Sequence, residues 1–237
     1  MVFAVVLAGG MGSRMGNSDT PKQFLILGKS PIIIHTVEKF YVNSKFEKVI
    51  VLCPKQWVSH TENIIKKSIK DEKIVVLEGG NTRNDTLYNA LNYIEQNHGI
   101  DDETIIVTHD AVRPFVTHRI IEENIEAAKK YGACDTVIPA TDTIVESKDG
   151  ETISSIPNRA ELFQGQTPQS FKANKLKNLY ESLTQDEKDK LTDACKIFSI
   201  KGEPVHLVQG EVFNMKITYP FDLRVAQTMI EGAITND

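Results

Sequence analysis

The sequence lacks several features that would point to particular classes of protein. It contains 3 cysteines among 237 residues, and Cys53, Cys134 and Cys195 are too widely separated for a disulfide framework or a zinc-binding pattern. Its formal net charge of −5 argues against a general nucleic-acid-binding protein, which usually carries a surplus of basic residues. An anionic ligand must therefore be held by cations that the fold gathers locally.

Long hydrophobic runs are also missing. The longest apolar stretches, such as residues 2–8, are far too short to cross a bilayer. The first residues show neither a basic segment nor a small-residue cleavage site. We therefore expect a cytoplasmic protein that does not insert in a membrane, with cysteines that are reduced and buried. Hydrophobic residues make up 41% of the composition, which is enough for one large domain over residues 1–237.

Short hydrophobic runs alternate with stretches of helical periodicity. The predicted strands are residues 3–7, 48–52, 73–77, 104–108 and 135–139. The predicted helices are residues 32–43, 57–69, 82–97 and 117–131, followed by 172–183, 193–199 and 221–230. This alternation predicts an α/β fold, a Rossmann-like and mainly parallel sheet with helices on both faces. Ligands of such sheets bind beyond the carboxyl ends of the strands, so the loops there are the ones to inspect.

Residues 141–159 interrupt the alternation. They contain two β-like segments about a Lys148–Gly150 turn, and Asp-Gly between alternating segments is a strong hairpin signal. A lone hairpin is marginally stable in water. We therefore predict a protruding β-hairpin arm that packs on a second subunit and makes the protein a homodimer. The alternative is a surface flap that packs on its own chain.

A glycine-rich loop follows the first predicted strand. Gly9, Gly10 and Gly12 let the backbone approach a ligand closely and adopt positive φ, and N–H groups in such loops bind phosphate oxygens. Two familiar phosphate-binding patterns do not fit. The Walker pattern ends in Gly-Lys-Ser/Thr, whereas Gly12 is followed by Ser13, and the dinucleotide pattern requires glycine where Met15 stands.

Two cations stand beside this loop. Arg14 lies within it, and Lys22 follows Pro21, whose ring stiffens the chain and favours a fixed position for the lysine ammonium. Two cations near a glycine loop suit a polyphosphate whose reacting phosphorus gains charge in the transition state. Taken alone, the loop has a structural alternative, because glycine turns and surface cations are common.

Two further loops follow predicted strands. Glycines at residues 79–80 allow a flat base to lie against backbone, and the polar residues 84–86 then open a helix; a plain strand-to-helix turn is the alternative. In the loop at residues 109–114, the Asp110 carboxylate suits a Mg²⁺ ion that also binds substrate phosphates. Arg113 orders either this loop or the nucleotide, and we interpret His109 as a structural hydrogen-bonding residue.

Five blocks together resemble the cytidylyltransferases that activate small polyol phosphates. The blocks cover essentially the whole chain in the order that this family shows: "LAGGMGSRMG…PKQF", "GGNTRNDTL", "HDAVRPF", "RAELFQGQTPQSF" and "NMKITYPFDL". One branch of the family makes CDP-methylerythritol for isoprenoids, and the other makes CDP-ribitol for wall teichoic acid. Gly9, where the isoprenoid branch usually has alanine, and the segments "DTIVES", "QGQTPQSF" and "TDACK" are more similar to the ribitol-5-phosphate branch.

The resemblance implies a role for each matched residue. The residues that it assigns to CTP are Leu7, Ala8, Gly9, Gly10, Gly80, Asn81, Thr82, Arg83, Asn84, Asp85 and Thr86. The residues that it assigns to catalysis are Arg14, Lys22, Arg159 and Lys216, with Thr143, Thr192 and Arg113 binding substrate and Asp110 facing Mg²⁺. Thr143 lies in the arm and is expected to reach the site of the neighbouring subunit.

The resemblance also implies a reaction. CTP and D-ribitol 5-phosphate are expected to give CDP-ribitol and pyrophosphate, with a ribulose-5-phosphate reductase as a functional partner. Arg159 and Lys216 are expected to position the acceptor for in-line attack on the α-phosphorus, while Arg14, Lys22 and Mg²⁺ stabilise the added charge. The alternatives are the same reaction with 2-C-methyl-D-erythritol 4-phosphate and a non-catalytic nucleotide-binding module.

Overall fold

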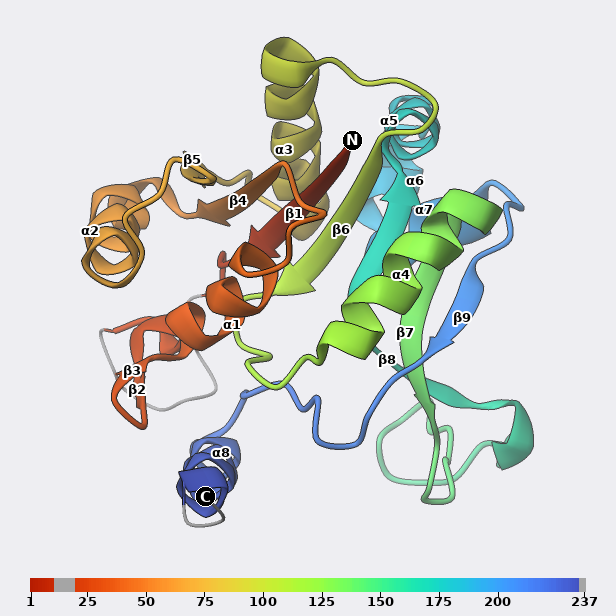
Figure 1. Ribbon diagram of the computed structural model, residues 1–237. Helices are drawn as coiled ribbons and strands as arrows, with labels where there is room; N and C mark the ends of the chain where they lie inside the picture. Colours follow the sequence, from red (N-terminus) through yellow and green to blue (C-terminus); the bar gives the residue numbers. More distant parts are fainter. Residues whose placement is uncertain (11–19, 235–237) are drawn as a thin grey trace.

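A computed structural model describes residues 1–10 and 20–234 of the chain, with side chains through residue 232. The roles predicted for Gly12 and Arg14 therefore lie outside the described residues. One sheet of seven strands, in the order β5-β4-β1-β6-β8-β7-β9, runs through the middle of the molecule (Figure 1). Its strands are β1 (Val2–Leu7), β4 (Lys48–Cys53), β5 (Ile74–Glu78), β6 (Ile105–Asp110), β7 (Ala133–Pro139), β8 (Phe163–Lys172) and β9 (His206–Gln209).

Strand direction confirms the prediction of a mainly parallel sheet. β1 pairs in parallel with β4 and β6, β4 with β5, and β7 with β9. β8 runs antiparallel to both of its neighbours, β6 and β7. A separate ribbon pairs β2 (Ile26–Leu27) with β3 (Ser30–Pro31).

Helices cover both faces of this sheet, as predicted (Figure 1). They are α1 (Ile32–Tyr41), α2 (Val58–Ser68), α3 (Arg83–His98), α4 (His118–Tyr131), α5 (Ala173–Glu181), α6 (Gln185–Asp189), α7 (Cys195–Ile200) and α8 (Pro220–Ile234). In β1, Ala4 and Val6 pack in a core with α1, α2 and α4, whereas Val5 and Leu7 pack in a second core with α3, α5 and α7. The strand is apolar throughout because side chains alternate between two buried faces.

The register of the strands brings three loops to one edge of the sheet. Leu7 pairs with Leu52 of β4 and with Asp110 of β6, and Cys53 pairs with Glu78 of β5. The carboxyl ends of β1, β5 and β6 therefore point the same way, and the segments that follow them meet beyond that edge. This is the position at which open α/β sheets bind their ligands.

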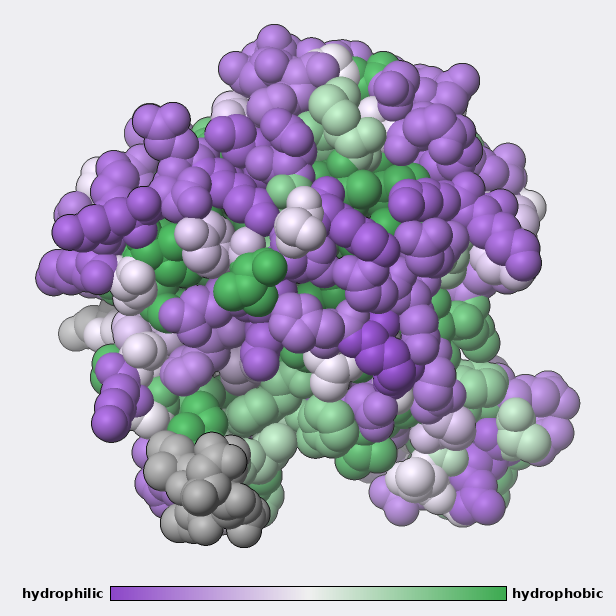
Figure 2. All heavy atoms as spheres, viewed as in Figure 1, coloured by the Kyte–Doolittle hydropathy of each residue, from purple (hydrophilic) through white to green (hydrophobic). Residues whose placement is uncertain are grey.

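The arm, residues 141–159, differs from its prediction. It projects from the body between β7 and β8, at the lower right of Figures 1 and 2. The predicted hairpin is present in a reduced form, because its two segments are joined by a single antiparallel bridge, Glu146 to Ser155. Gly150 makes the predicted turn with a φ of 78°. No further strand in the described part of the chain pairs with this segment to extend the bridge, and an isolated two-stranded ribbon gains little stability.

Two structural findings bear on the compositional predictions. No helix in the described part of the chain is long and apolar enough to cross a membrane. The three cysteines are free thiols; Cys53 and Cys134 are buried, and Cys195 is partly buried.

Candidate active site

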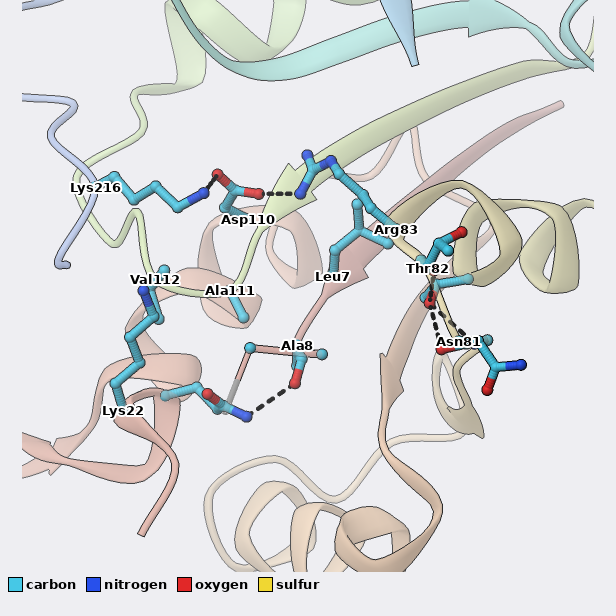
Figure 3. A pocket seen from close by; sticks show the side chains of 15 residues that line it. Leu7, Ala8, Lys22, Asn81, Thr82, Arg83, Asp110, Ala111, Val112 and Lys216 are labelled. Atoms are coloured by element: carbon cyan, nitrogen blue, oxygen red, sulfur yellow. Dashed lines mark hydrogen bonds and ion pairs between the residues drawn. The ribbon is translucent and has the colours of Figure 1, made fainter. Parts of the chain in front are cut away.

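A pocket of about 310 Å³ lies beyond the carboxyl ends of β1, β5 and β6 (Figure 3). Its residues come from the loop after β1, the turn at Lys22, the segment that opens α3, the end of β6 and the segment before α8. The lining residues are Leu7, Ala8, Gly9, Gly10, Lys22, Gln23, Gly80, Asn81, Thr82, Arg83, Thr86, Asp110, Ala111, Val112 and Lys216. The fold thus brings together in one chain most of the residues predicted to bind CTP.

The described part of the glycine loop presents bare backbone to this pocket. A Cβ at Gly9 would meet nothing within 4 Å, and a Cβ at Gly10 would lie 3.7 Å from Cε of Lys22. Neither glycine has positive φ, so the predicted left-handed backbone is wrong for these two residues. The Gln23 side chain donates a hydrogen bond to the carbonyl of Ala8 at 2.8 Å, which fixes the start of the loop. Gln23 was not predicted as a site residue, although it lies within the PKQF block.

Lys22 begins a single 3₁₀ turn, Lys22–Phe24, that Pro21 precedes. Its side chain extends into the pocket (Figure 3), and only 9% of the residue is exposed. A cation in a partly desolvated position attracts an anion more strongly than a cation in bulk water does. The predicted fixed position of this lysine is therefore consistent with its surroundings.

Asp110, at the end of β6, is the centre of a cluster of charges. Arg83 donates a hydrogen bond to its Oδ1 at 2.5 Å, while the Lys216 ammonium and the Arg113 Nε lie 3.0 Å and 3.3 Å from its Oδ2. Burial raises the pKa of the Asp110 carboxyl, but Arg83, Lys216 and Arg113 outweigh burial and hold that pKa well below its usual range. The carboxylate is therefore ionised at neutral pH and holds three cations, of which Arg83 and Lys216 line the pocket.

His109 is a structural residue in this geometry. It is fully buried; its Nε2 donates to the carbonyl of Arg113 at 3.0 Å, and its Nδ1 lies 2.9 Å from the hydroxyl of Thr167. Burial lowers the pKa of His109 to about 4, although the bond to the Arg113 carbonyl opposes that shift. A neutral ring with both nitrogens occupied has no free position for proton transfer to substrate.

The nucleotide loop, named for its predicted role, comprises residues 79–86 and joins β5 to α3. Thr82 caps the helix: its hydroxyl accepts from the Asp85 N–H at 3.1 Å, and its own N–H donates to Asp85 Oδ2 at 3.2 Å. The Thr86 hydroxyl accepts from the Gly80 N–H at 2.9 Å. A Cβ at Gly80 would lie 2.4 Å from the Asp85 Cβ, so only glycine fits there.

Some residues assigned to CTP lie behind this loop. Asn84 is 5% exposed, and neither Asn84 nor Asp85 lines the main pocket; both line a second pocket beside α5 and α6. Arg113 is also directed at the protein, since its Nη1 donates to the carbonyl of Asn214 at 2.8 Å and its Nε contacts Asp110. Of the two roles left open for Arg113, this geometry supports the structural one.

Other predicted substrate residues lie outside the pocket of their own chain. Arg159 and Thr143 are exposed on the arm, where Arg159 donates to the carbonyl of Thr141 at 2.9 Å. Thr192 is exposed, in the segment before α7, and does not line the main pocket. The single chain thus brings Lys22 and Lys216 to one pocket and leaves Arg159 apart from Lys216.

The donors in the pocket fit a Mg²⁺ ion bound together with substrate. Asp110 is the only acidic residue among the described residues that line it, and no cluster of three or more His, Cys, Asp or Glu suited to a metal occurs in residues 1–10 and 20–234. Mg²⁺ is commonly held by one or two carboxylates plus substrate phosphates. One buried carboxylate in the same pocket as the bare backbone of Gly9 and Gly10 matches that arrangement.

Comparison with known proteins gives the family. The sequence profile of IspD, 2-C-methyl-D-erythritol 4-phosphate cytidylyltransferase, matches residues 2–232. Among similar solved structures, that enzyme from Francisella tularensis is 27% identical, with a TM-score of 0.80 over 96% of this chain and 98% of its own. The enzyme of the same name from Thermus thermophilus is 26% identical, with a TM-score of 0.75 over 98% of this chain and 100% of its own.

A third similar structure is 4-diphosphocytidyl-2C-methyl-D-erythritol synthase from Anaerococcus prevotii. It is 25% identical, with a TM-score of 0.80 over 97% of this chain and 96% of its own. The chain belongs to the 2-C-methyl-D-erythritol 4-phosphate cytidylyltransferase family. It is a nucleotidyltransferase with the α/β fold of that family and uses CTP.

Proposed function

We propose that this member of the family transfers the cytidylyl group of CTP to the phosphate of a short polyol monophosphate and releases pyrophosphate. The observation that carries the proposal is the convergence of Lys22, Lys216 and Arg83 on one pocket that also exposes the backbone of Gly9 and Gly10. Cations and bare backbone from separate segments provide a site for a triphosphate and an incoming anion. A chain with a net charge of −5 needs this local concentration of cations.

The chemistry follows from the charges. A phosphate monoester is mostly dianionic at neutral pH, since its second pKa is about 6, so it needs no strong base to act as a nucleophile. One of its oxygens forms a bond to the α-phosphorus of CTP while the bond from that phosphorus to the bridging oxygen of pyrophosphate breaks. Lys216 positions the acceptor, and Lys22 stabilises the charge that develops at the α-phosphate.

Asp110 is the residue that would hold Mg²⁺. When bound, the ion supplies positive charge that neutralises the triphosphate. The ion and Lys216 would share the Asp110 carboxylate, because Lys216 already lies 3.0 Å from its Oδ2.

Two acceptors have specific support. The names of the family profile and of the similar structures favour 2-C-methyl-D-erythritol 4-phosphate over D-ribitol 5-phosphate. D-Ribitol 5-phosphate is favoured by Gly9 and by the segments DTIVES, QGQTPQSF and TDACK in this chain. That interpretation would place the enzyme in the supply of CDP-ribitol for wall teichoic acid, with a ribulose-5-phosphate reductase providing the acceptor.

A paired assay distinguishes these acceptors. Purified enzyme with CTP and Mg²⁺ is given each polyol phosphate in turn, and the release of pyrophosphate is measured as kcat/KM. The physiological acceptor is expected to exceed the other by about a hundredfold or more, because a pocket built for one hydroxyl pattern leaves polar groups unpaired with another. Tight binding of CTP with no pyrophosphate released from either acceptor would contradict the proposed activity and favour a non-catalytic module.

We further propose that the arm completes the site of a second copy of the chain. Ile144, Val145, Ile153 and Ile156 on the arm are between 36% and 62% exposed, and the arm forms its own lobe in Figure 2. Apolar side chains gathered on a projecting segment favour contact with another protein surface. The exposed Arg159 and Thr143 then belong to the neighbour's pocket, which agrees with their absence from their own.

Mixed dimers test this arrangement. One chain carries Lys22→Ala and the other Arg159→Ala, with different affinity tags so that the heterodimer is isolated. Each homodimer is expected to be nearly inactive, whereas the heterodimer retains about half of the wild-type kcat because one of its two equivalent sites keeps both residues. A heterodimer of wild type with the double variant Lys22→Ala/Arg159→Ala is the control, since each of its two sites then lacks one of the residues. Equal activity of the two heterodimers would show that Arg159 does not act across subunits.

A further inference from the structure

A second pocket, of about 360 Å³, adjoins the nucleotide loop and shares Thr82 and Arg83 with the main pocket. Its remaining walls come from the start of α3, the end of α5 and α6, and they include Asp85, Tyr180 and Lys188. Segments about a hundred residues apart in the chain therefore meet at the start of α3, the helix that follows the nucleotide loop. This contact has no part in the mechanism described above.

Tyr180 makes the central contact. Its hydroxyl donates a hydrogen bond to Asp85 Oδ1 at 2.8 Å, while Asp85 Oδ2 accepts the N–H of Thr82. One carboxylate thus closes the cap of α3 with one oxygen and receives Tyr180 with the other. Tyr180 is 6% exposed and belongs to the core that also contains Leu87 and Leu176. Its ring is held by close packing, so its hydroxyl is a fixed point for Asp85.

Asp85 in turn lies directly against the backbone of Gly80. A Cβ at Gly80 would lie 2.4 Å from the Cβ of Asp85 and 2.7 Å from its carbonyl carbon. The Asp85 side chain therefore packs against the bare backbone of Gly80, in space that a side chain at residue 80 would occupy. This packing contact and the hydrogen bond from the Thr82 N–H join Asp85 to the backbone that lines the main pocket at Gly80 and Thr82.

Lys188 of α6 supports the same arrangement. Its ammonium lies 4.6 Å from the centre of the Tyr180 ring, within the range of a cation–π interaction. The hydrogen bond from Tyr180 is the largest cause that lowers the pKa of Asp85; burial opposes it, and the charge of Lys188 adds to it. The carboxylate therefore stays ionised as the acceptor of the Tyr180 hydroxyl.

We propose that Tyr180 is a positioning residue for CTP binding. Through its hydrogen bond to Asp85, Tyr180 holds the Gly80–Thr82 backbone in place. The inference rests on the proposed function in that CTP is taken as the nucleotide that this backbone binds. Tyr180 lines the second pocket and not the main one, so it acts through Asp85.

Replacement of Tyr180 by phenylalanine tests the inference with little change in packing. The KM and Kd for CTP are expected to rise at least about fivefold, which corresponds to about 1 kcal/mol, near the net contribution of one hydrogen bond. The KM for the acceptor is expected to stay within about twofold, because Asp85 is bonded to Thr82 and Tyr180 and makes no direct hydrogen bond or ion pair with Lys216 or the arm in the described part of the chain.

Tyr88→Phe is the matched control. The Tyr88 ring lies 5.0 Å from that of Tyr180, and its hydroxyl donates to Glu181 Oε1 at 2.7 Å, so the variant loses a tyrosine-to-carboxylate bond that does not reach the loop. Both variants are compared by melting temperature and by direct titration with CTP. An unchanged CTP Kd in Tyr180→Phe, or equal increases in both variants, would overturn the inference. A wild-type enzyme that fails to bind CTP in the same titration would overturn the proposed function as well.

Discussion

Replacement of Lys22 by alanine is expected to lower kcat by about a hundredfold or more. That is the scale of losing one preorganised donor at the position where charge develops in a transition state. Lys22 is 9% exposed and lines the main pocket. A water molecule in the space left by the shortened side chain is neutral and does not restore the fixed positive charge. The Kd for CTP is expected to change less than kcat, because the substitution leaves unchanged the loops at Gly9–Gly10 and Gly80–Thr82 that we propose bind the nucleotide. The rate of pyrophosphate release measures kcat, and calorimetric titration with CTP measures the Kd.

The chain offers a close control for this variant. Pro54, Lys55 and Gln56 repeat the Pro-Lys-Gln sequence of residues 21–23, and Lys55 also begins a 3₁₀ turn after a proline of nearly the same backbone angles. Lys55 is exposed and does not line the pocket. Lys55→Ala is therefore expected to leave kcat unchanged. Unchanged turnover in Lys22→Ala would remove Lys22 from the mechanism.

This pair of turns illustrates what local sequence predicts and what it does not. Both Pro-Lys-Gln segments adopt the same turn, because proline fixes φ at the position that precedes the lysine. Only tertiary packing distinguishes them: Phe24, at the end of the Lys22 turn, is buried in the core that contains β1, whereas Lys55 opens a turn at the start of α2. Composition and spacing predict the turn, and the position of β1 and β6 decides which lysine faces the pocket.

The fold was predictable where periodicity was strong. The apolar runs at β1, β4 and β6 and the helical spacing of α1 to α4 gave elements that differ from the structure by a few residues at their ends. β8 was not predicted, since Gln164, Gln166 and Gln169 make it polar. These side chains find partners across the fold, as when Gln166 donates to the carbonyl of Glu211 at 2.8 Å. A sequence does not reveal such long-range partners for buried polar groups.

The charge cluster was predicted only in part for the same reason. The sequence indicated Asp110 as a metal ligand and assigned Arg83 and Lys216 to separate substrates. The structure joins them: Arg83 is 27 residues from Asp110 in the chain, and Lys216 reaches it from the segment before α8. Nothing in the local pattern of either cation shows that Asp110 is its partner.

Replacement of Asp110 by asparagine is expected to lower the free energy of unfolding by about 3–5 kcal/mol at neutral pH, the usual cost of removing one partner from a buried ion pair. Asparagine keeps the shape of the side chain but leaves Arg83, Arg113 and Lys216 without their shared anion. The Asp110 side chain is 6% exposed and that of Arg113 is 11% exposed. Water therefore solvates the Arg113 charge poorly once the carboxylate is removed. Urea unfolding of wild type and variant measures the difference. Lys216→Met is the control: the Lys216 side chain is 39% exposed, and loss of such a cation costs about 1 kcal/mol or less.

The pH dependence separates the charge of Asp110 from its shape. The folded pKa of Asp110 lies below its ordinary value of 3.8, so the folded state binds fewer protons than the unfolded state as the solution is acidified. The stability that the carboxylate contributes is therefore fully present above a pH of about 5 and is lost as the pH falls through 3.8 toward the folded pKa. The difference in the free energy of unfolding between wild type and Asp110→Asn is expected to be constant between about pH 6 and pH 8. It is expected to become smaller below about pH 4. If the difference stays the same on acidification, asparagine destabilises the site through packing, and the three cations do not depend on the charge of Asp110.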